Sequence, residues 1–236
     1  GLIGENGAGK TTLLKILLGI SHAEEGKIRI LGKDFKAHDA EIKAEIGVVL
    51  DDMFFSEVLT PDDIGKTMAD IFRSWDDKLF EGYLEEFALP AKKPMKTFSK
   101  GMRKKLEIAA ALSHRPKLQI LDEHTNGLEP VVRNEIIDIF QAFVNDEEHT
   151  ILLSTHITTD LEHIADQIIF LDRGKKVMDE SRDEIMDEYA ILRCDKDFLD
   201  KLDDGDIIRY QIHPYSCVVL VRGRERMQMR YPECVI

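Results

Sequence analysis

The 236-residue sequence predicts an α/β fold in which a mostly parallel sheet is flanked by helices. In the second half of the chain, short apolar runs alternate with amphipathic helical segments, the pattern of a parallel sheet covered on both faces. A glycine-rich loop at the start of the chain runs directly into a helical pattern, as in phosphate-binding α/β folds. With 43% hydrophobic residues, the chain can bury a substantial core.

The glycine-rich loop is the segment GENGAGKTT, residues 4–12. It fits the pattern G-x-x-x-x-G-K-[ST] of P-loop NTPases, in which backbone amides surround phosphate oxygens. Lys10 is expected to reach the outer phosphates, and the Thr11 hydroxyl to bind Mg²⁺. A glycine-rich turn that merely precedes a helix is the alternative. The predicted nucleotide-binding residues of the loop are Gly4, Glu5, Asn6, Gly7, Ala8, Gly9, Lys10, Thr11 and Thr12.

After the loop and its helix, the sequence predicts two strand segments and then a helical region. Residues 27–35 (KIRILGKDF) alternate apolar and polar side chains and turn at Gly32, which predicts a strand entering a hairpin. Residues 46–50 (IGVVL) fit a buried strand. A helical region begins at Thr60, a suitable N-cap that is followed by proline and two aspartates. Further helices are expected at about 76–87 and from Ser99 onward.

From residue 118 onward, strands and helices alternate. Strands are expected at 118–122, 150–155 and 167–172, and helices at 130–145 and 159–165. The segment DRGKKV predicts a hairpin. Ser181 and Glu184 form a capping box that opens another helix. Beyond it, YAILRC, IIRYQI and CVVLVRG are β-type, and a short helix is expected at 197–202.

Composition narrows the function. The net charge of −13 argues against broad electrostatic binding to nucleic acid. Cys194, Cys217 and Cys234 are far apart in sequence without metal-type spacing, so they are expected to be reduced thiols of a cytosolic protein. No apolar run approaches the roughly 20 residues that a membrane helix needs.

The segment LQILDE ends an apolar strand in two carboxylates, Asp122 and Glu123. A strand end beside a phosphate loop is where a metal ion and an attacking water are held. Asp122 is therefore the candidate Mg²⁺ ligand, and Glu123 is the candidate that polarises the nucleophile. A simple strand boundary is the alternative.

Three further segments make the pattern specific. Residues 98–112 (FSKGMRKKLEIAAAL) resemble the signature motif of ATP-binding cassette (ABC) ATPases, residues 126–130 (NGLEP) their D-loop, and His156 in STHITTDLE their switch histidine. All motifs occur in the family's order over residues 1–180. The resemblance implies that Glu123 is the general base, that His156 contacts the γ-phosphate, and that Ser99 and Gly101 bind ATP across a dimer.

Some positions depart from the family pattern. Asp51 stands where the family has a glutamine that ligates Mg²⁺, and it is the third candidate metal ligand after Thr11 and Asp122. Aspartate remains a suitable hard oxygen ligand, although it is shorter and charged. His124 replaces a proline, and Glu129 replaces the D-loop aspartate. These departures bear on turnover and partner coupling more than on nucleotide binding.

The resemblance also implies partners. Two ABC domains, a homodimer or paralogues, would sandwich ATP and Mg²⁺ head to tail and drive a separate integral membrane permease at the cytoplasmic face of the membrane. Residues 53–75 are where the family docks its permease; Met53 to Phe55 could supply apolar contact there or belong to the ordinary core. The Lys-Gly-Met signature resembles bacterial exporters and favours export, although the chain does not identify the cargo.

The resemblance sets the expected domain organisation. Residues 1–180 would be the ABC domain, with a helical subdomain at about 53–115, and residues 181–236 a small C-terminal α/β appendage. In the family, N-terminal antiparallel strands and an adenine-stacking aromatic residue precede the phosphate loop, so we expect this chain to be a fragment. The arginine-rich segment 222–230 is either a solvated face or a partner-binding patch.

Two other function classes remain open. One is a soluble ABC ATPase acting on ribosomes or DNA; the paired cassettes and long coiled coils typical of those proteins do not occur in this sequence. The other is a regulatory ABC subunit that binds ATP with weak turnover. Lys10, Asp122, Glu123 and His156 argue against it, whereas Asp51 and His124 keep it open.

Overall fold

The structure is a computed structural model that describes residues 1–51, 55–195, 198–199, 202–203, 205–232 and 234. Its contacts divide the chain into two compact units. Unit 1 comprises Gly1–Ala165 and Ile169–Met178. Unit 2 comprises Asp166–Ile168 and Asp179–Ile236.

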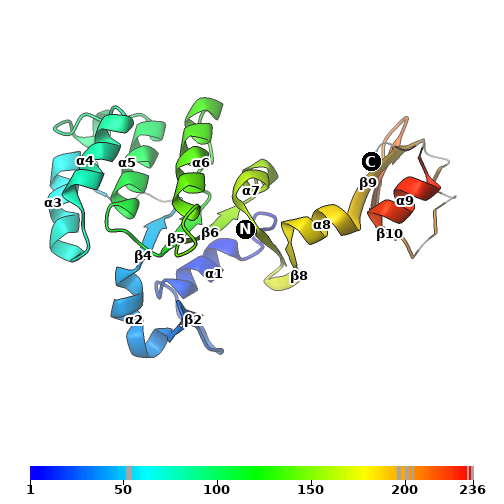
Figure 1. The fold of residues 1–236 in the computed structure, drawn as a ribbon, viewed down its shortest axis with the longest axis horizontal. Helices are drawn as coiled ribbons and strands as arrows, with labels where there is room; N and C mark the ends of the chain where they lie inside the picture. Colours follow the sequence, from blue (N-terminus) through cyan, green and yellow to red (C-terminus); the bar gives the residue numbers. More distant parts are fainter. Residues whose placement is uncertain (52–54, 196–197, 200–201, 204, 233, 235–236) are drawn as a thin grey trace. The chain divides into compact units, whose positions relative to one another are not determined.

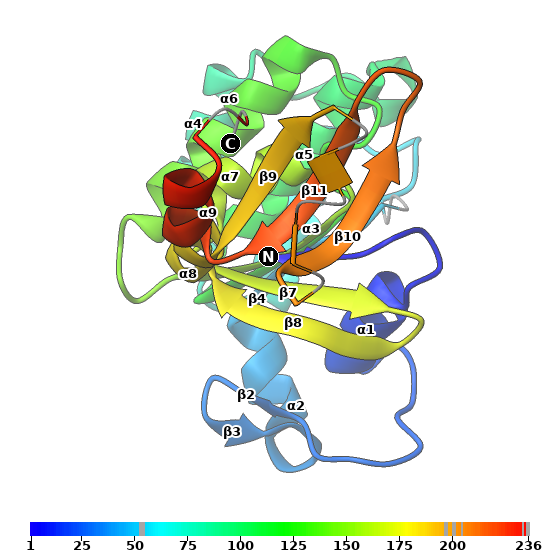
Figure 2. The same ribbon diagram turned by 90° about the vertical axis from the view of Figure 1, so that its right-hand side faces the viewer.

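A six-stranded sheet has the order β4-β5-β6-β1-β7-β8 (Figure 1). The β4–β5, β5–β6, β6–β1 and β1–β7 pairs are all parallel, which confirms the predicted sheet and brings the carboxyl ends of five strands to one edge. β8 completes a hairpin with β7 (Figure 2). The strands are β1 (Leu2–Ile3), β4 (Ile46–Val49), β5 (Leu118–Asp122), β6 (Thr150–Thr155), β7 (Gln167–Asp172) and β8 (Lys175–Ser181).

The predicted hairpin after the first helix is present but short, and a helix that we did not predict follows it. β2 (Arg29–Ile30) and β3 (Lys33–Asp34) pair antiparallel around Gly32. Asp34 then accepts a hydrogen bond from the Ala37 amide and caps α2 (Phe35–Ala44). This helix has few large apolar residues and an irregular backbone at His38, so its sequence shows little helical periodicity.

The helical block of unit 1 follows its prediction closely. Its helices are α3 (Pro61–Ile71), α4 (Asp77–Glu86), the 3₁₀ turn η1 (Met95–Thr97) and α5 (Lys100–Leu112), and they pack side by side (Figure 1). Thr60 and Asp63 form a capping box at the start of α3. The Ser99 hydroxyl caps α5 by accepting a hydrogen bond from the Met102 amide at 3.2 Å. Apolar side chains such as Ile64 and Leu106 fill the interior of the block.

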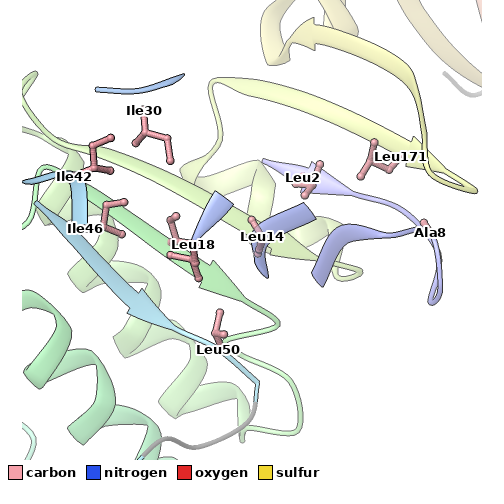
Figure 3. Packing of buried hydrophobic residues seen from close by; sticks show 10 residues of the cluster. Leu2, Ala8, Leu14, Leu18, Ile30, Ile42, Ile46, Leu50 and Leu171 are labelled. Carbon is pink, nitrogen blue, oxygen red and sulfur yellow. The ribbon is translucent and has the colours of Figure 1, made fainter. Parts of the chain in front are cut away.

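The remaining helices of unit 1 are α1 (Lys10–Leu17), α6 (Pro130–Val144) and α7 (Thr158–Ile164). Of these, α1 contributes side chains to the main core. Leu14 and Ile42 are fully buried, and Figure 3 shows them beside the strand residues Leu2 and Ile46. Each such burial stabilises the fold by about 1.5–3 kcal/mol. The core therefore fixes α1, and with it the phosphate loop, against the sheet.

Unit 2 contains a three-stranded antiparallel sheet of order β10-β11-β9 (Figure 2). Its strands coincide with the three segments predicted to be β-type, whereas their pairing was not predicted. The elements are α8 (Arg182–Glu188), β9 (Tyr189–Cys194), β10 (Ile207–Ile212), β11 (Cys217–Arg222) and α9 (Arg224–Arg230). The predicted helix at 197–202 lies largely outside the described residues. We did not predict α9, because only its fully buried Met227 distinguishes it from a solvated charged run.

The arginine-rich segment and the cysteines take defined places in unit 2. Arg222 pairs with Glu188 at 2.6 Å, and Arg226 pairs with Asp206.

Cys194 and Cys217 lie opposite each other in register with their Sγ atoms 3.4 Å apart. Burial, assisted by Cys217, raises the pKa of Cys194 to about 12, so this thiol stays protonated at neutral pH.

Candidate nucleotide site

The phosphate loop connects β1 to α1, and its sequence dictates its path. A Cβ atom at Gly4 would collide with the Leu171 carbonyl oxygen, so only glycine allows β1 and β7 to come this close. Gly9 has φ = 103° at the N-cap of α1, a conformation that glycine adopts without steric cost. Ala8 is buried, whereas Glu5, Asn6, Gly7, Thr11 and Thr12 are exposed.

Lys10 extends back across this loop. Its side chain is only 6% exposed, and Nζ donates hydrogen bonds to the carbonyl oxygens of Gly4 at 2.8 Å and Glu5 at 3.4 Å. The same Nζ lies 3.6 Å from Oε1 of Glu123. The lysine charge is thus held between the phosphate loop and the end of β5.

Glu123 and His156 meet at the carboxyl edge of the sheet. Oε2 of Glu123 lies 2.6 Å from Nδ1 of His156, which follows the adjacent strand β6. Glu123 has φ = 47°, an unfavourable conformation for a non-glycine residue, and its amide donates to the Ser154 carbonyl oxygen at 2.9 Å. Parallel neighbouring strands therefore bring Lys10, Glu123 and His156 from three separate segments into one cluster.

Asp122, the candidate magnesium ligand, has a buried carboxylate. It is 1% exposed, and among the described residues its Oδ1 atom has no hydrogen-bond partner. A buried carboxylate oxygen without a partner is costly, and a hard cation would satisfy it. The exposed Asp51 follows β4, whose Val49 pairs in register with Leu121 beside Asp122, so it lies beyond the same edge. The unpartnered Oδ1 atom of Asp122 is thus suited to a cation, and Thr11 is exposed at the start of α1.

A buried polar pair links the signature helix to the segment before Asp51, and sequence reasoning missed it. Nζ of Lys104 on α5 donates to the Leu50 carbonyl oxygen at 2.9 Å and lies 2.9 Å from Oε2 of Glu107. Burial raises the pKa of Glu107, and Lys104 opposes that shift. In the sequence RKKLE these charges look solvated, so no sequence signal identified the pair.

His124, one of the departures from the family pattern, is completely buried. Its ring contacts Phe140 edge-on, with the ring centroids 5.3 Å apart. Burial lowers the pKa of His124 to about 4, so the imidazole is neutral at pH 7 and packs as an apolar ring would. It therefore occupies a core position directly after Glu123 in the sequence.

Ser99 and Gly101 are not brought to the phosphate loop within this chain. Among the described residues, no hydrogen bond or ion pair joins them to residues 4–12. Ser99 is exposed at the start of α5, and a Cβ atom at Gly101 would lie 3.3 Å from Val132 Cγ1. The signature therefore packs beside the start of α6, and within the described ranges its exposed end forms no hydrogen bond or ion pair with the other site residues.

The residues predicted to meet a permease are only partly described. Met53 and Phe54 lie outside the described residues. Phe55 packs against the core of the helical block, which agrees with the ordinary-core alternative for that side chain. Within the described ranges, no helix combines the length and apolar character that a membrane crossing requires.

The comparisons with known proteins agree with this geometry. The family model described as ABC transporter matches residues 1–126, more than half of the chain. The lantibiotic transport ATP-binding protein SrtF of Streptococcus pyogenes is 35% identical over 192 residues, covering 77% of this chain and 78% of SrtF. The uncharacterized ABC transporter ATP-binding protein YcbN of Bacillus subtilis is 34% identical over 78% of this chain, which spans 61% of the length of YcbN.

A solved structure gives the same result for the fold. The structure described as the ATP binding subunit of an ABC transporter superposes with a TM-score of 0.69 and 28% identity, covering 78% of each chain. Together with the family model and with SrtF, this likeness identifies the fold and the family. The chain therefore belongs to the ABC transporter family of ATP-binding domains.

Proposed function

We propose that this chain is the ATP-binding and ATP-hydrolysing subunit of an ABC transporter. The observation that carries the proposal is the convergence of Lys10, Glu123 and His156 beside the phosphate loop. Glu123 oxygens lie 3.6 Å from Nζ of Lys10 and 2.6 Å from Nδ1 of His156. Phosphoryl transfer needs positioned charge more than covalent chemistry, and this cluster supplies a cation, a base and an imidazole at one point.

Each residue of the cluster has a distinct role in hydrolysis. The amides of the loop and Nζ of Lys10 bind the phosphates. The Glu123 carboxylate accepts a proton from the attacking water as general base. Nζ of Lys10 lies 3.6 Å from the same carboxylate. His156 donates from Nδ1 to Glu123, which orients the ring so that its other nitrogen faces the γ-phosphate.

Thr11, Asp122 and Asp51 would hold Mg²⁺, which when bound neutralises negative charge on the phosphates. The unpartnered Oδ1 atom of Asp122 supports this assignment. Asp51 is the weakest member of the set, because no hydrogen bond or ion pair orients its carboxylate among the described residues.

The catalytic assembly is a head-to-tail dimer with a second ABC domain, either another copy or a paralogue. Within one chain, Ser99 and Gly101 do not reach the phosphate loop, so one chain surrounds only part of the γ-phosphate. The exposed start of α5 is positively polarised and is suited to the outer oxygens of an ATP held by the partner's loop.

The assembly drives transport through a separate membrane permease at the cytoplasmic face of the membrane. SrtF, a similar protein, is described as a lantibiotic transport protein, and the Lys-Gly-Met signature favours export. We assign residues 1–180 to the ATP-binding domain, with its helical subdomain at about 53–115, and residues 181–236 to an accessory region. The division of the chain supports this boundary, because most of the second compact unit begins at residue 179.

The test is ATP hydrolysis by the full-length protein, compared with its Glu123→Gln variant. We expect Mg²⁺-dependent turnover in the parent and a loss of about 10²–10⁴-fold in the variant, with ATP binding retained. Glu147→Gln is the matched control, because this exposed acid precedes β6 at the opposite edge of the sheet. A parent that binds ATP without measurable turnover would favour the regulatory alternative instead.

A further inference from the structure

Behind Glu123 and His156, a buried carboxylate joins the two segments that carry them. Asp160 on α7 is 0% exposed. Its Oδ2 atom accepts a hydrogen bond from Oγ1 of Thr125 at 2.6 Å, and its Oδ1 atom accepts one from Nε of Arg133 at 2.6 Å. Nη2 of Arg133 also donates to Oγ1 of Thr159 at 2.5 Å.

This network has the character of a fixed link rather than a surface ion pair. An isolated carboxylate is very costly to bury, and it is tolerated only when charge and hydrogen bonds compensate it. Here both oxygens of Asp160 have a donor, one of them a guanidinium whose side chain is only 23% exposed. Charge-assisted hydrogen bonds of this kind are short and directional, so they restrain the elements they connect.

The hydrogen bond between Thr125 and Asp160 lies close in sequence to both Glu123 and His156. Thr125 comes two residues after Glu123, and Asp160 comes four residues after His156. Glu123 has the unfavourable φ of 47°, and such a conformation persists only when its surroundings hold it. Two short backbone segments, 123–125 and 156–160, are therefore joined at both ends. The Thr125–Asp160 hydrogen bond joins them at one end, and the 2.6 Å contact between Glu123 and His156 joins them at the other.

We propose that Asp160, together with Thr125 and Arg133, is a positioning group for ATP hydrolysis that holds the Glu123 carboxylate in register with the His156 imidazole. The inference rests on the proposed function, because it concerns the geometry of the same reaction. None of the three residues need touch ATP; they act through the backbone segments of Glu123 and His156. A displacement of about 1 Å between reacting groups can cost roughly 10²-fold in rate, so such a link can affect turnover strongly.

The test compares Thr125→Val with Thr125→Ser in the full-length protein. Valine keeps the shape of threonine but cannot donate to Asp160, whereas serine keeps the donor. We expect Thr125→Val to lower kcat by roughly 10- to 100-fold, with the KM for ATP changed by less than about threefold. Thr125→Ser should retain most of the parent kcat, which a role in packing the methyl group would not produce.

Ser113→Ala is the matched control, since Ser113 is also fully buried and its hydroxyl donates to the Ala109 carbonyl oxygen at 2.6 Å. It should lose stability without losing kcat. If Thr125→Val proves too unstable, Arg133→Lys replaces it, and a lower kcat with unchanged ATP binding is again expected. A parent that does not hydrolyse ATP would overturn the proposed function. A parent that hydrolyses ATP while Thr125→Val turns over at the parent rate would overturn the positioning role alone.

Discussion

At the scale of single residues, the candidate site is centred on the Glu123 carboxylate, which lies between a lysine and a histidine. Nζ of Lys10 lies 3.6 Å from one oxygen, and Nδ1 of His156 lies 2.6 Å from the other. In the proposed function, the phosphates of ATP would compete for Nζ of Lys10. Glu123 would then depend more on His156 for its orientation, and this is the state in which the proposed restraint through Asp160 would act.

Buried histidines should make the stability of unit 1 depend on pH. His114 is 1% exposed, its Nε2 atom lies 3.1 Å from the Ile46 carbonyl oxygen, and burial lowers its pKa from 6.5 despite that carbonyl. Below pH 6.5, the unfolded chain binds a proton that the folded chain does not, so the free energy of unfolding falls as pH falls. Between pH 7.5 and 5.5, we expect a clear loss of stability in urea unfolding.

The variant His114→Gln isolates this contribution. Its side-chain amide can still donate to the Ile46 carbonyl oxygen but does not titrate in this range. The loss of stability on acidification should therefore be smaller in the variant than in the parent. It should not vanish, because His124 is buried and its pKa is lowered in the same direction. An identical pH dependence in both proteins would count against a neutral buried His114.

At the scale of elements, Lys104 connects α5 to the residue after β4 by donating to the Leu50 carbonyl oxygen, and Glu107 on the same helix pairs with it. Both side chains are less than 10% exposed, so removing one charge leaves the other buried without a partner. We expect Lys104→Met to lower the free energy of unfolding by roughly 3 kcal/mol. The double variant Lys104→Met/Glu107→Leu should lose only about 1–2 kcal/mol, since the lost bond to the Leu50 carbonyl oxygen is then the main cost.

Urea unfolding of the parent, the two single variants and the double variant measures this coupling. A double variant whose loss equals the sum of the single losses would show that the two charges do not interact. ATP turnover adds a second readout, because Leu50 directly precedes the candidate Mg²⁺ ligand Asp51. Turnover should fall in the double variant more than its small loss of stability explains.

The sequence predicted those helices and strands whose capping residues or apolar pattern are sufficient to identify them. The capping box of Thr60 and Asp63 and the apolar run of β5 both identify their elements without tertiary information. By contrast, α2 and α9 are mostly polar and each buries one side chain fully, Ile42 and Met227. With so little apolar periodicity, only contact with the rest of the protein reveals that they are helices.

The same distinction separates the predicted from the unpredicted parts of the site. Lys10 and Glu123 each follow a local pattern, a glycine-rich loop and a strand end, so the sequence indicated both. His156 was indicated only by the resemblance to the ABC family, because a lone histidine after a strand has no specific local signal. Asp160, Arg133 and Lys104 lie on amphipathic helices, where a charged residue is usually solvated. Asp160 contacts Thr125 and Arg133, which are 35 and 27 residues away in sequence, and Lys104 contacts the Leu50 carbonyl 54 residues away, so no spacing rule predicts these contacts. The i,i+3 spacing of Lys104 and Glu107 is a known pattern, but it does not indicate that the pair is buried.

At the scale of the whole molecule, the predicted site residues come from unit 1, and Ser99 and Gly101 remain away from the loop within the chain. Completion of the site by a second domain is therefore the central expectation. The −13 charge of each chain opposes association of two copies, so ATP has to stabilise the interface. Dimer formation should consequently depend on ATP and weaken after hydrolysis.

Glu123→Gln in the full-length protein should trap that dimer. The substitution keeps the size of the side chain and its ability to accept a hydrogen bond, but glutamine cannot take a proton from water. ATP therefore persists between the phosphate loop of one chain and Ser99 of the other, and the interface stays closed. Size-exclusion chromatography with ATP and Mg²⁺ should show a shift from monomer to dimer that the parent shows only transiently. If the dimer combines a copy with a paralogue, the paralogue must be present.

Adding Ser99→Arg should reverse the shift, because a long side chain at the exposed start of α5 blocks approach of the opposing nucleotide while residues 4–12 remain intact. ATP binding by each chain, measured separately, should survive in both variants. A Glu123→Gln protein that binds ATP yet stays monomeric would contradict the head-to-tail assembly. One that forms the dimer equally well with Ser99→Arg would place the interface on a surface other than the signature, since no nucleotide would then bridge the two chains there.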